Sequence, residues 1–299
     1  MYLNHLLRIF ITAAIFLSFS IQAEKPLKIA SWNIEWLTSH PSPNISSSFR
    51  SSDDYKKIAH YYSMLGADVL GFQEVNDIDV IKGVVGSDYT IWISDRSLLE
   101  NKQHQFHDIN QYTGFAVHKK FAVTSMPGIR LESTATSKLR FASYIVLGPN
   151  TAQPIHMLSV HLKAGCIAKY RNNKSCRRLK AQAKRLNLWI RDRELDNEAY
   201  IILGDFNHNL SYPSDWMWAQ LTVDTQAALA SAATKPDCKV KSRKQPEETF
   251  QYRSVIDHVV ISKTLSFTVA KQQLYEREDL IKYHLSDHCP VVSEIHYRK

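Results

Sequence analysis

The sequence predicts an α/β fold of the α+β kind, in which two packed, mixed β-sheets are covered by helices. Several short apolar runs of strand type are separated by stretches whose apolar residues have helical spacing. The two kinds of stretch do not alternate regularly, so a parallel, doubly wound sheet is not expected. The chain has no internal repeat and no low-complexity segment, and residues 24–299 are therefore expected to form one domain.

The first 23 residues have the layout of a secretory signal peptide. Arg8 is followed by the apolar run IFITAAIFLSFSI, and Gln22 and Ala23 offer a small-residue cleavage point. The alternative is a membrane anchor, but a spanning helix needs about 20 apolar residues and this run is shorter. We therefore expect cleavage after Ala23, release into the periplasm or the medium, and no membrane-spanning segment in the mature chain.

The composition is that of a globular, basic protein. The chain is 44% apolar and 22% charged, which excludes large-scale disorder. Cleavage removes one charged residue, Arg8, so 37 basic residues become 36 against 29 acidic ones, a formal net charge of +7. A positive charge favours polyanionic partners or membrane surfaces, although solubility alone also accounts for it.

Strands are expected at the short apolar runs and helices where the apolar spacing is helical. In chain order, the expected strands cover residues 26–36, 67–75, 89–93, 112–117, 140–147, 154–162, the run from Ile201 to Gly204, 254–262 and the tail after His288. The expected helices cover residues 54–65, part of 76–89, 177–194 and part of 215–233. The polar stretches 38–53, 97–111 and 234–250 are expected to be loops.

Polar side chains recur where these strands end. They are Asn33, Glu35, Glu74, His161, Asp205, Asn207, Asp257, Asp287 and His288. A packed strand fixes the residue that follows it, so enzymes built on sheets often keep their sites there. Each position alone has an ordinary interpretation, such as an Asp-Phe-Asn turn or a polar edge strand. The repetition favours one shared site.

The residue types indicate the chemistry of such a site. Carboxylates and amides, without a cysteine cluster or an HExxH pattern, suit Mg²⁺, with Mn²⁺ or Ca²⁺ as alternatives. His288 and His161 beside acidic partners suit general acid and base catalysis. For His161, a hydrogen-bonded core histidine on an apolar strand is the alternative.

A basic segment follows His161. Residues 163–185 contain nine Lys and Arg and no acidic residue. We expect Lys163, Arg171, Arg177 and Arg178 to bind substrate phosphates or nucleic acid, with a solvated face as the alternative. Arg96 is a further candidate phosphate clamp, for which an ordinary surface arginine is the alternative.

The four cysteines are expected to form disulfides if the chain is exported. Cys166 and Cys176 lie ten residues apart in one polar loop, and closing a short loop costs little entropy, so we expect this bridge. Pairing of Cys238 with Cys289 would follow by elimination. A buried thiol at Cys289, which lies in an apolar tail, is the alternative.

Six short motifs occur in a fixed order: WNIEW, GFQEV, SVHL, GDFN, IDHVV and SDHCPV. Together they resemble the motif series of the endonuclease/exonuclease/phosphatase superfamily, over essentially the whole mature chain. The resemblance implies a four-layered α/β sandwich like that of pancreatic deoxyribonuclease. It also implies metal-dependent cleavage of a phosphoester.

The resemblance implies roles for individual residues. Glu74 matches the principal metal ligand, Asn33 the asparagine that supports metal and scissile phosphate, and Asp287 the aspartate beside the metal, with Glu35 as a further candidate ligand. The residues matched to catalysis act on water and phosphate. Asp205 and Asn207 match the pair that positions the water and the phosphate. His288 matches the histidine that acts on the water, and Asp257 matches the partner that orients this histidine. His161 matches a second histidine, and Tyr112 matches a phosphate-contacting tyrosine.

The motifs imply a reaction but not a substrate. Export, basic charge and the basic segment favour a secreted, Mg²⁺-dependent nuclease that hydrolyses DNA or RNA by attack of an activated water. The alternatives are a phospholipid or sphingomyelin-type phosphodiesterase, in which Trp216 and Trp218 would dock on membrane, and a small-molecule phosphatase. An inactive nucleic-acid-binding protein is the least favoured interpretation. We expect a monomer without a stable protein partner.

Overall fold

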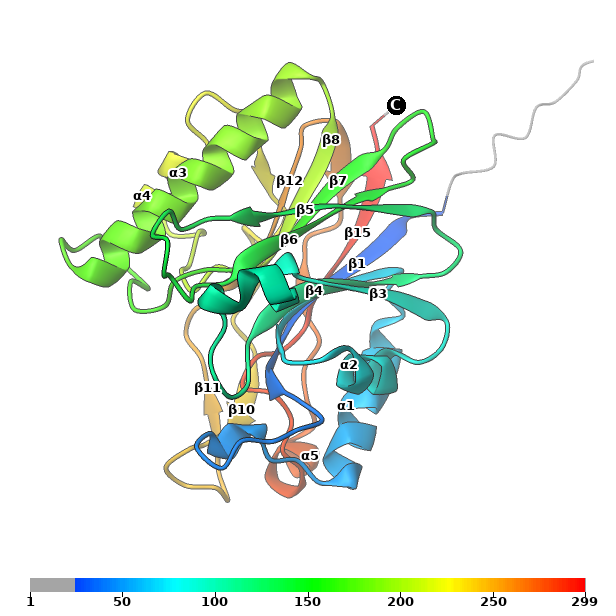
Figure 1. Ribbon diagram of the computed structural model, residues 1–299, viewed down its shortest axis with the longest axis vertical. Helices are drawn as coiled ribbons and strands as arrows, with labels where there is room; N and C mark the ends of the chain where they lie inside the picture. Colours follow the sequence, from blue (N-terminus) through cyan, green and yellow to red (C-terminus); the bar gives the residue numbers. More distant parts are fainter. Residues whose placement is uncertain (1–24, 299) are drawn as a thin grey trace, which may run out of the picture.

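The computed structural model describes residues 25–298. Two β-sheets pack face to face, and helices cover the outer face of each, so the expected four-layered sandwich is confirmed (Figure 1). Phe115 of one sheet and Met157 of the other lie in the apolar core between the sheets. Two further apolar clusters lie beneath the helices, one on each side of the sandwich.

The first sheet has the strand order β13-β15-β1-β2-β4-β3, with β14 paired to β15. The only parallel pair among these described strands is β1 with β2. The strands are β1 Leu27–Leu37, β2 Val69–Val75, β3 Tyr89–Ile93, β4 Tyr112–His118, β13 Leu265–Phe267, β14 Lys271–Gln272 and β15 Val291–Tyr297. Its outer face is covered by α1 Ser52–Leu65 and α2 Ile78–Val85. A capping box at Ser51 begins α1, and Gly66 with φ 54° ends it.

The second sheet has the order β5-β6-β7-β8-β12-β9, in which β7 and β8 run parallel. Its strands are β5 Val123–Arg130, β6 Phe141–Leu147, β7 Ile155–His161, β8 Ala199–Asp205, β9 Ala228–Leu229 and β12 Asp257–Ile261. It is covered by α3 Lys174–Leu195 and α4 Trp216–Leu221. As expected, α3 turns Leu179, Leu186, Trp189 and Ile190 toward the sheet.

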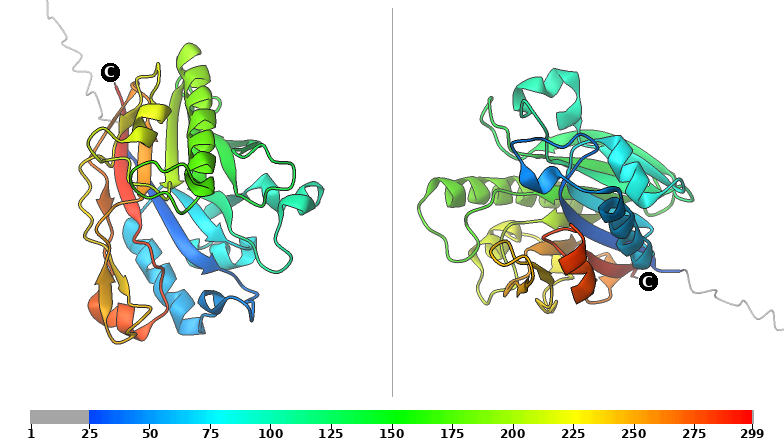
Figure 2. Two further views of the ribbon diagram at one scale, coloured as in Figure 1. Left: turned by 90° about the vertical axis from the view of Figure 1, so that its left-hand side faces the viewer. Right: turned by 90° about the horizontal axis from the view of Figure 1, so that it is seen from below.

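A separate two-stranded ribbon and a short helix lie together at one end of the molecule (Figures 1 and 2). The ribbon is β10 Lys239–Lys241 paired with β11 Thr249–Gln251, and the helix is α5 Arg277–Lys282. Short 3₁₀ segments complete the described chain: η1 Ser46–Ser48, η2 Asp95–Ser97 and η3 Leu99–His104.

The structure corrects several expected elements. The expected loop 234–250 contains most of the ribbon, whose strands have three residues each, with one apolar residue in each, and so lack an apolar signal. Strand β5 was not expected because Pro127 and Gly128 interrupt its pattern, and it tolerates them as an edge strand with a register shift. Strand β12 begins at Asp257 and not at residue 254 as expected, so this carboxylate lies at the start of the strand.

Both cysteine pairs form disulfides in the structure. Cys166 and Cys176 are joined as expected, and Cys238 is joined to Cys289, which decides against a free thiol. Two disulfides fit an oxidising compartment outside the cytoplasm. The expected signal peptide lies outside the described residues. Within residues 25–298, no helix combines the length and the apolar character needed to cross a bilayer.

The close approach of β7 and β8 requires glycine at position 204. Gly204 pairs with Val160, and its φ is 147°. A Cβ atom built there would lie 2.0 Å from the carbonyl oxygen of Val160, a backbone atom that cannot turn away. Glycine is therefore fixed directly before Asp205 by packing.

We predict that Gly204→Ala lowers the free energy of unfolding by roughly 3 kcal/mol, because it combines a backbone clash with an unfavourable φ. Urea unfolding followed by circular dichroism measures it. The matched control is Gly83→Ala in α2, where an added Cβ meets no atom within 4 Å and helix propensity improves by up to about 1 kcal/mol. Equal effects of the two substitutions would contradict this account.

Candidate active site

Residues of five strands converge, three of them because of strand register. Across β7, β8 and β12, His161 pairs with Asp205 and Asp205 pairs with Asp257, so the three lie in one row. From the other sheet, the Asn33 amide nitrogen donates to Glu74 Oε1 and to Asp205 Oδ2, both at 3.1 Å. Asn33 is only 1% exposed. The structure thus brings together residues of both sheets that sequence analysis had collected one by one.

Backbone strain is concentrated at the same strand ends. Glu35, Trp36, Glu74 and Asn207 have φ values of 42°, 51°, 59° and 52°, in the left-handed region that residues other than glycine seldom adopt. Each such residue costs of order 1–3 kcal/mol and persists only where the surroundings enforce it. Strain at three separate strand ends indicates a functional site.

His288 and Asp257 form a close pair. The Nδ1 atom of His288 lies 2.7 Å from Asp257 Oδ2, while its Nε2 lies 3.9 Å from Asp205 Oδ2 and 3.9 Å from Asp287 Oδ1. Burial alone would lower the pKa of His288, but the charge and hydrogen bond of Asp257 raise it well above its ordinary value. The imidazole is therefore held charged, with Nε2 directed into the acidic cluster.

His161 has the opposite character. Its Nε2 lies 3.6 Å from Glu74 Oε1 and 3.4 Å from Asp205 Oδ2, and its Nδ1 has no hydrogen-bond partner among the described residues. Burial and the nearby charge of Arg140 lower the pKa of His161 well below its ordinary value. It is a neutral imidazole within the cluster, and its position is not that of an ordinary core histidine.

Asp205 lies at the centre of these contacts. The backbone and side-chain nitrogens of Asn207 donate to its two oxygens at 2.7 and 3.0 Å. Burial raises the pKa of Asp205 to about 7, and the charges of Asp257 and Glu74 act in the same direction. Burial likewise raises the pKa of Asp287 to about 6, with further repulsion from Glu35 and Glu74. Repulsion between neighbouring carboxylates therefore adds to the cost of burying Asp205 and Asp287.

The residues present fit a hard divalent cation. Glu74, Asn33 and Asp287 offer the oxygen ligands that Mg²⁺ prefers, and mutual repulsion of the carboxylates is what a cation would relieve. Within residues 25–298, no three His, Cys, Asp or Glu side chains converge closely enough to form a ligand set.

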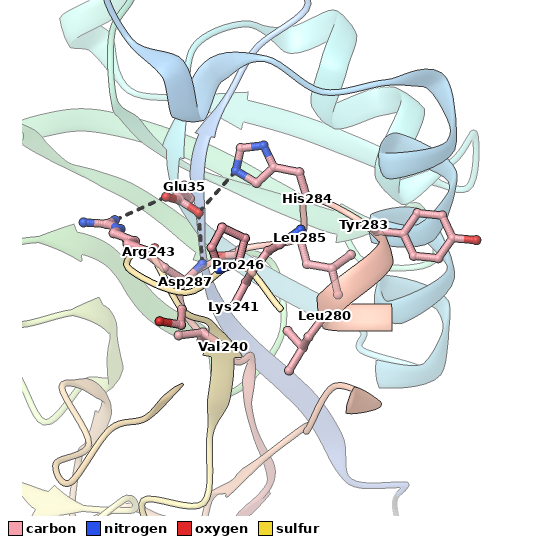
Figure 3. Close-up of a pocket in the computed structure, with 12 residues that line it drawn as sticks. Glu35, Val240, Lys241, Arg243, Pro246, Leu280, Tyr283, His284, Leu285 and Asp287 are labelled. Carbon is pink, nitrogen blue, oxygen red and sulfur yellow. Dashed lines mark hydrogen bonds and ion pairs between the residues drawn. The ribbon is translucent and has the colours of Figure 1, made fainter. Parts of the chain in front are cut away.

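Glu35 has different partners from the other acids. Its Oε1 lies 3.3 Å from a guanidinium nitrogen of Arg243, and its Oε2 accepts a hydrogen bond of 3.1 Å from the Asp287 backbone (Figure 3). His284 Nε2 lies 3.8 Å from the same Oε2. These residues line a cavity of about 190 Å³ between the β10–β11 ribbon and the loop before His288. The cavity opens beside the acidic cluster.

The structure contradicts both expectations for Arg96. Its side chain is completely buried, so it is neither a surface arginine nor a group that a substrate can reach. Its guanidinium donates to the carbonyls of His104 and Gln111 and to the Asn110 side chain. The ring of Tyr112 packs against it, 5.4 Å from the guanidinium carbon. Tyr112 is itself buried at the start of β4, and its contact with phosphate stays a prediction.

The basic segment begins at the site and runs onto the surface. Lys163 follows Leu162, whose carbonyl accepts hydrogen bonds from Asn207 and from Arg140. Arg171 and Arg177 are exposed on the disulfide-closed loop and the first turn of α3. Arg178 lies 3.5 Å from Glu132, the Arg177 guanidinium donates to Asn172, and the Lys163 ammonium donates to the Ala164 carbonyl, so three of the four candidates already have a protein partner.

Two further residues at the site, Arg140 and Arg50, were not predicted from the sequence. Arg140 interacts electrostatically with Glu74 and Asp205, and its buried Nε has no hydrogen-bond partner among the described residues. Arg50 donates to the carbonyls of Glu35 and Leu285, which ties the end of β1 to the loop before His288. Arg140 precedes its strand and Arg50 lies in a loop, so neither lies at the carboxyl end of a strand.

Comparison with known proteins was made on sequence and on structure. A family model described as Endonuclease/Exonuclease/phosphatase family matches residues 30–288. No curated protein matches the chain. An endonuclease/exonuclease/phosphatase family protein from Bacteroides thetaiotaomicron superposes with a TM-score of 0.65 at 15% identity, covering 92% of this chain and 100% of that chain.

Two further structures are similar in fold. A mannosyl-6-phosphatase of Bacteroides thetaiotaomicron gives a TM-score of 0.62 at 15% identity, over 91% of this chain and 100% of its own. The human nocturnin catalytic domain, solved with a bound sulfate anion, gives 0.62 at 17% identity, over 91% of this chain and 95% of its own. At these identities the likeness concerns the fold alone.

The loop that carries Asn207 depends on a neutral histidine. Nε2 of His258 accepts the Leu210 backbone N–H at 3.1 Å, and Nδ1 lies 2.7 Å from Ser231 Oγ. Nε2 also lies 3.1 Å from the His208 carbonyl oxygen, a contact that raises the pKa of His258, but burial outweighs it and lowers this pKa to about 3.

We predict that acid destabilises the native state through His258. The unfolded chain binds this proton near pH 6.5 and the native chain only near pH 3, so the stabilisation is complete above about pH 6.5 and is lost as pH falls. The slope is up to about 1.4 kcal/mol per pH unit. Urea unfolding between pH 7.5 and 4.5 should show a flatter dependence for His258→Gln than for wild type or for the exposed control His60→Gln. An identical dependence in all three would refute the assignment.

Proposed function

Because the chain belongs to the endonuclease/exonuclease/phosphatase family, whose members hydrolyse phosphoric esters, we propose that it is a divalent-metal-dependent phosphodiesterase that cleaves nucleic acid outside the cytoplasm. The observation that carries the reaction type is the joining of Glu74 and Asp205 by the Asn33 amide, beside the His288–Asp257 pair. This arrangement provides a cation ligand, a proton acceptor and a charged donor in one cluster.

In this mechanism water attacks phosphorus, a P–O bond forms, and the bond to the leaving oxygen breaks. Asp205 accepts the proton of the water, since its pKa near 7 matches neutral pH and Asn207 fixes both of its oxygens. Glu74, with Asn33 and Asp287 beside it, would hold a divalent cation, which would supply positive charge to the phosphoryl oxygens. His288, kept charged by Asp257, donates a hydrogen bond to the phosphoryl group.

Arg140 is a second donor for the phosphate. One of its terminal nitrogens is held by the Leu162 carbonyl at 2.8 Å, and its Nε is left unpaired. A guanidinium fixed in this way recognises phosphate oxygens with a preset geometry. Its electrostatic interaction with Glu74, Asp205 and Lys163 supports binding of a substrate anion rather than a purely structural role.

The rim of the site supports a nucleic acid substrate. Phe250 and Tyr252 are 53% and 39% exposed, and their rings meet edge to face at 5.2 Å. The pKa of Tyr252 is raised first by burial and then by the charge of Asp287, which places this ring beside the site. Tyr212, 43% exposed, is held by Ser254 on the same side. Exposed rings beside the site suit stacking of unpaired bases.

A lipid substrate is less well supported. Docking on a membrane calls for apolar side chains at a projecting tip. The tip of the ribbon next to the site, residues 242–248, reads SRKQPEE and is charged. Trp216 packs edge to face against Tyr170 and His208, and its indole nitrogen donates to the Ala168 carbonyl, so this tryptophan is engaged within the protein.

The bound sulfate of human nocturnin gives indirect support, because sulfate resembles phosphate and that domain has the same fold. The mannosyl-6-phosphatase fold keeps a small phosphomonoester as the second candidate, since a cavity of about 190 Å³ adjoins the cluster here. The exposed aromatic rim and the basic segment favour the polymer.

We predict that the purified mature chain nicks plasmid DNA or degrades single-stranded nucleic acid with Mg²⁺, and that EDTA abolishes this. His288→Ala and Glu74→Gln should each lower kcat by about 10³-fold or more without a change in melting temperature, since each removes one part of the charge stabilisation. Asp224→Asn, an exposed carboxylate, is the matched control.

The same variants decide between substrates. Sphingomyelin vesicles and mannose 6-phosphate are assayed in parallel under identical conditions. Turnover of either one, with no cleavage of DNA or RNA by a folded and metal-supplemented protein, would overturn the nucleic acid assignment while keeping the family's chemistry. Unchanged nuclease activity in His288→Ala would instead remove the proposed mechanism.

A further inference from the structure

Arg243 occupies an unusual position at the tip of the β10–β11 ribbon. A single terminal nitrogen lies 2.7 Å from Asp287 Oδ2 and 3.3 Å from Glu35 Oε1, so it bridges two carboxylates (Figure 3). The Arg243 side chain is 76% exposed, while those of Glu35 and Asp287 are 10% and 24% exposed. A positive group reaching from solvent to link two nearly buried carboxylates occupies a place where a divalent cation would also be stable.

The ribbon that carries Arg243 is firmly attached to the site. Cys238, just before β10, is joined by a disulfide to Cys289, the residue after His288, with 5.8 Å between their Cα atoms. Val240 is buried in the same apolar cluster as Cys238 and Cys289. The guanidinium is thus presented from a strand fixed to the segment that carries His288 and Asp287.

Glu35 is already fully engaged by protein groups. One oxygen contacts Arg243, and the other accepts the Asp287 backbone N–H at 3.1 Å. The Arg50 guanidinium donates to the Glu35 carbonyl at 2.8 Å, and its charge also acts on Glu35 and Asp287. Such a carboxylate needs no metal to compensate its charge. Glu74 differs, because its direct contacts among the described residues are an amide, a histidine and a backbone N–H, while the charge of Arg140 also acts on it.

We propose that Arg243 takes the place of a second divalent cation between Glu35 and Asp287, so that this chain binds a single cation, at Glu74. Glu35 then anchors Arg243 and is not a metal ligand, which replaces the role expected for it from the sequence. The inference rests on the proposed metal-dependent phosphodiesterase function. The remaining N–H groups of Arg243 are available to a substrate phosphate oxygen, a contact that a guanidinium makes with defined geometry.

The test is the stoichiometry of Mn²⁺ binding, measured by electron paramagnetic resonance of free Mn²⁺ on the whole mature protein without substrate. We expect wild type to bind one Mn²⁺ and Arg243→Ala to bind two, because the substitution removes the positive group that bridges the two carboxylates. Arg243→Lys, which keeps the charge, should bind one. Since Arg243 is exposed, melting temperatures should be similar in all three proteins.

Two further variants separate the ligands. Glu35→Gln should bind one Mn²⁺ with an affinity within about twofold of wild type, whereas Glu74→Gln should lose at least tenfold in affinity. Two Mn²⁺ in wild type, one in Arg243→Ala, or a tenfold loss in Glu35→Gln would each overturn the proposal for Arg243 while leaving metal dependence in place. Absence of Mn²⁺ binding in wild type would overturn the metal dependence itself, and with it the proposal.

Discussion

The amide of Asn33 is the contact on which the site depends. Its nitrogen donates to Glu74 on the first sheet and to Asp205 on the second, and its oxygen accepts the Glu35 backbone N–H at 3.1 Å. One buried side chain thus joins two carboxylates across the sandwich and fixes the strained end of β1. A neutral amide can do this where a charged donor would cancel the acidic field that a cation requires. His161 and His288 are then arranged around the Asp205 oxygen that Asn33 holds.

The surrounding fold is organised to keep these groups close despite their repulsion. Gly204 allows β7 and β8 to approach, which brings His161 beside Asp205. The Cys238–Cys289 disulfide fixes the residue after His288, and the His288 carbonyl receives hydrogen bonds from Trp32 and Tyr275. Buried carboxylates and left-handed backbone at Glu74 and Asn207 are unfavourable in isolation. They persist because packing on both sheets enforces them, as is common where stability is given up for function.

Much of the fold and of the site could be predicted from the sequence, because local patterns placed polar residues at the ends of several apolar strands and the ordered motifs indicated that these ends meet. The features that could not be predicted also have physical reasons. Arg243 lies 208 residues from Glu35 along the chain, and no local signal reports a contact formed only when a charged ribbon folds back over the site. Arg140 precedes its strand rather than following it. Arg96 was predicted to bind phosphate or to face solvent, whereas three hydrogen-bond acceptors and an aromatic ring hold it in the interior.

The central claim is that a divalent cation relieves repulsion within the acidic cluster, and equilibrium unfolding in urea with and without Mg²⁺ tests it most directly. The account predicts that Mg²⁺ at about a hundred times its Kd raises the free energy of unfolding of wild type by about 2.7 kcal/mol. Without Mg²⁺, Glu74→Gln should be at least as stable as wild type, since it removes one repelling charge, and it should gain little from Mg²⁺. No stabilisation of wild type by Mg²⁺, or an equal gain in Glu74→Gln, would contradict the account.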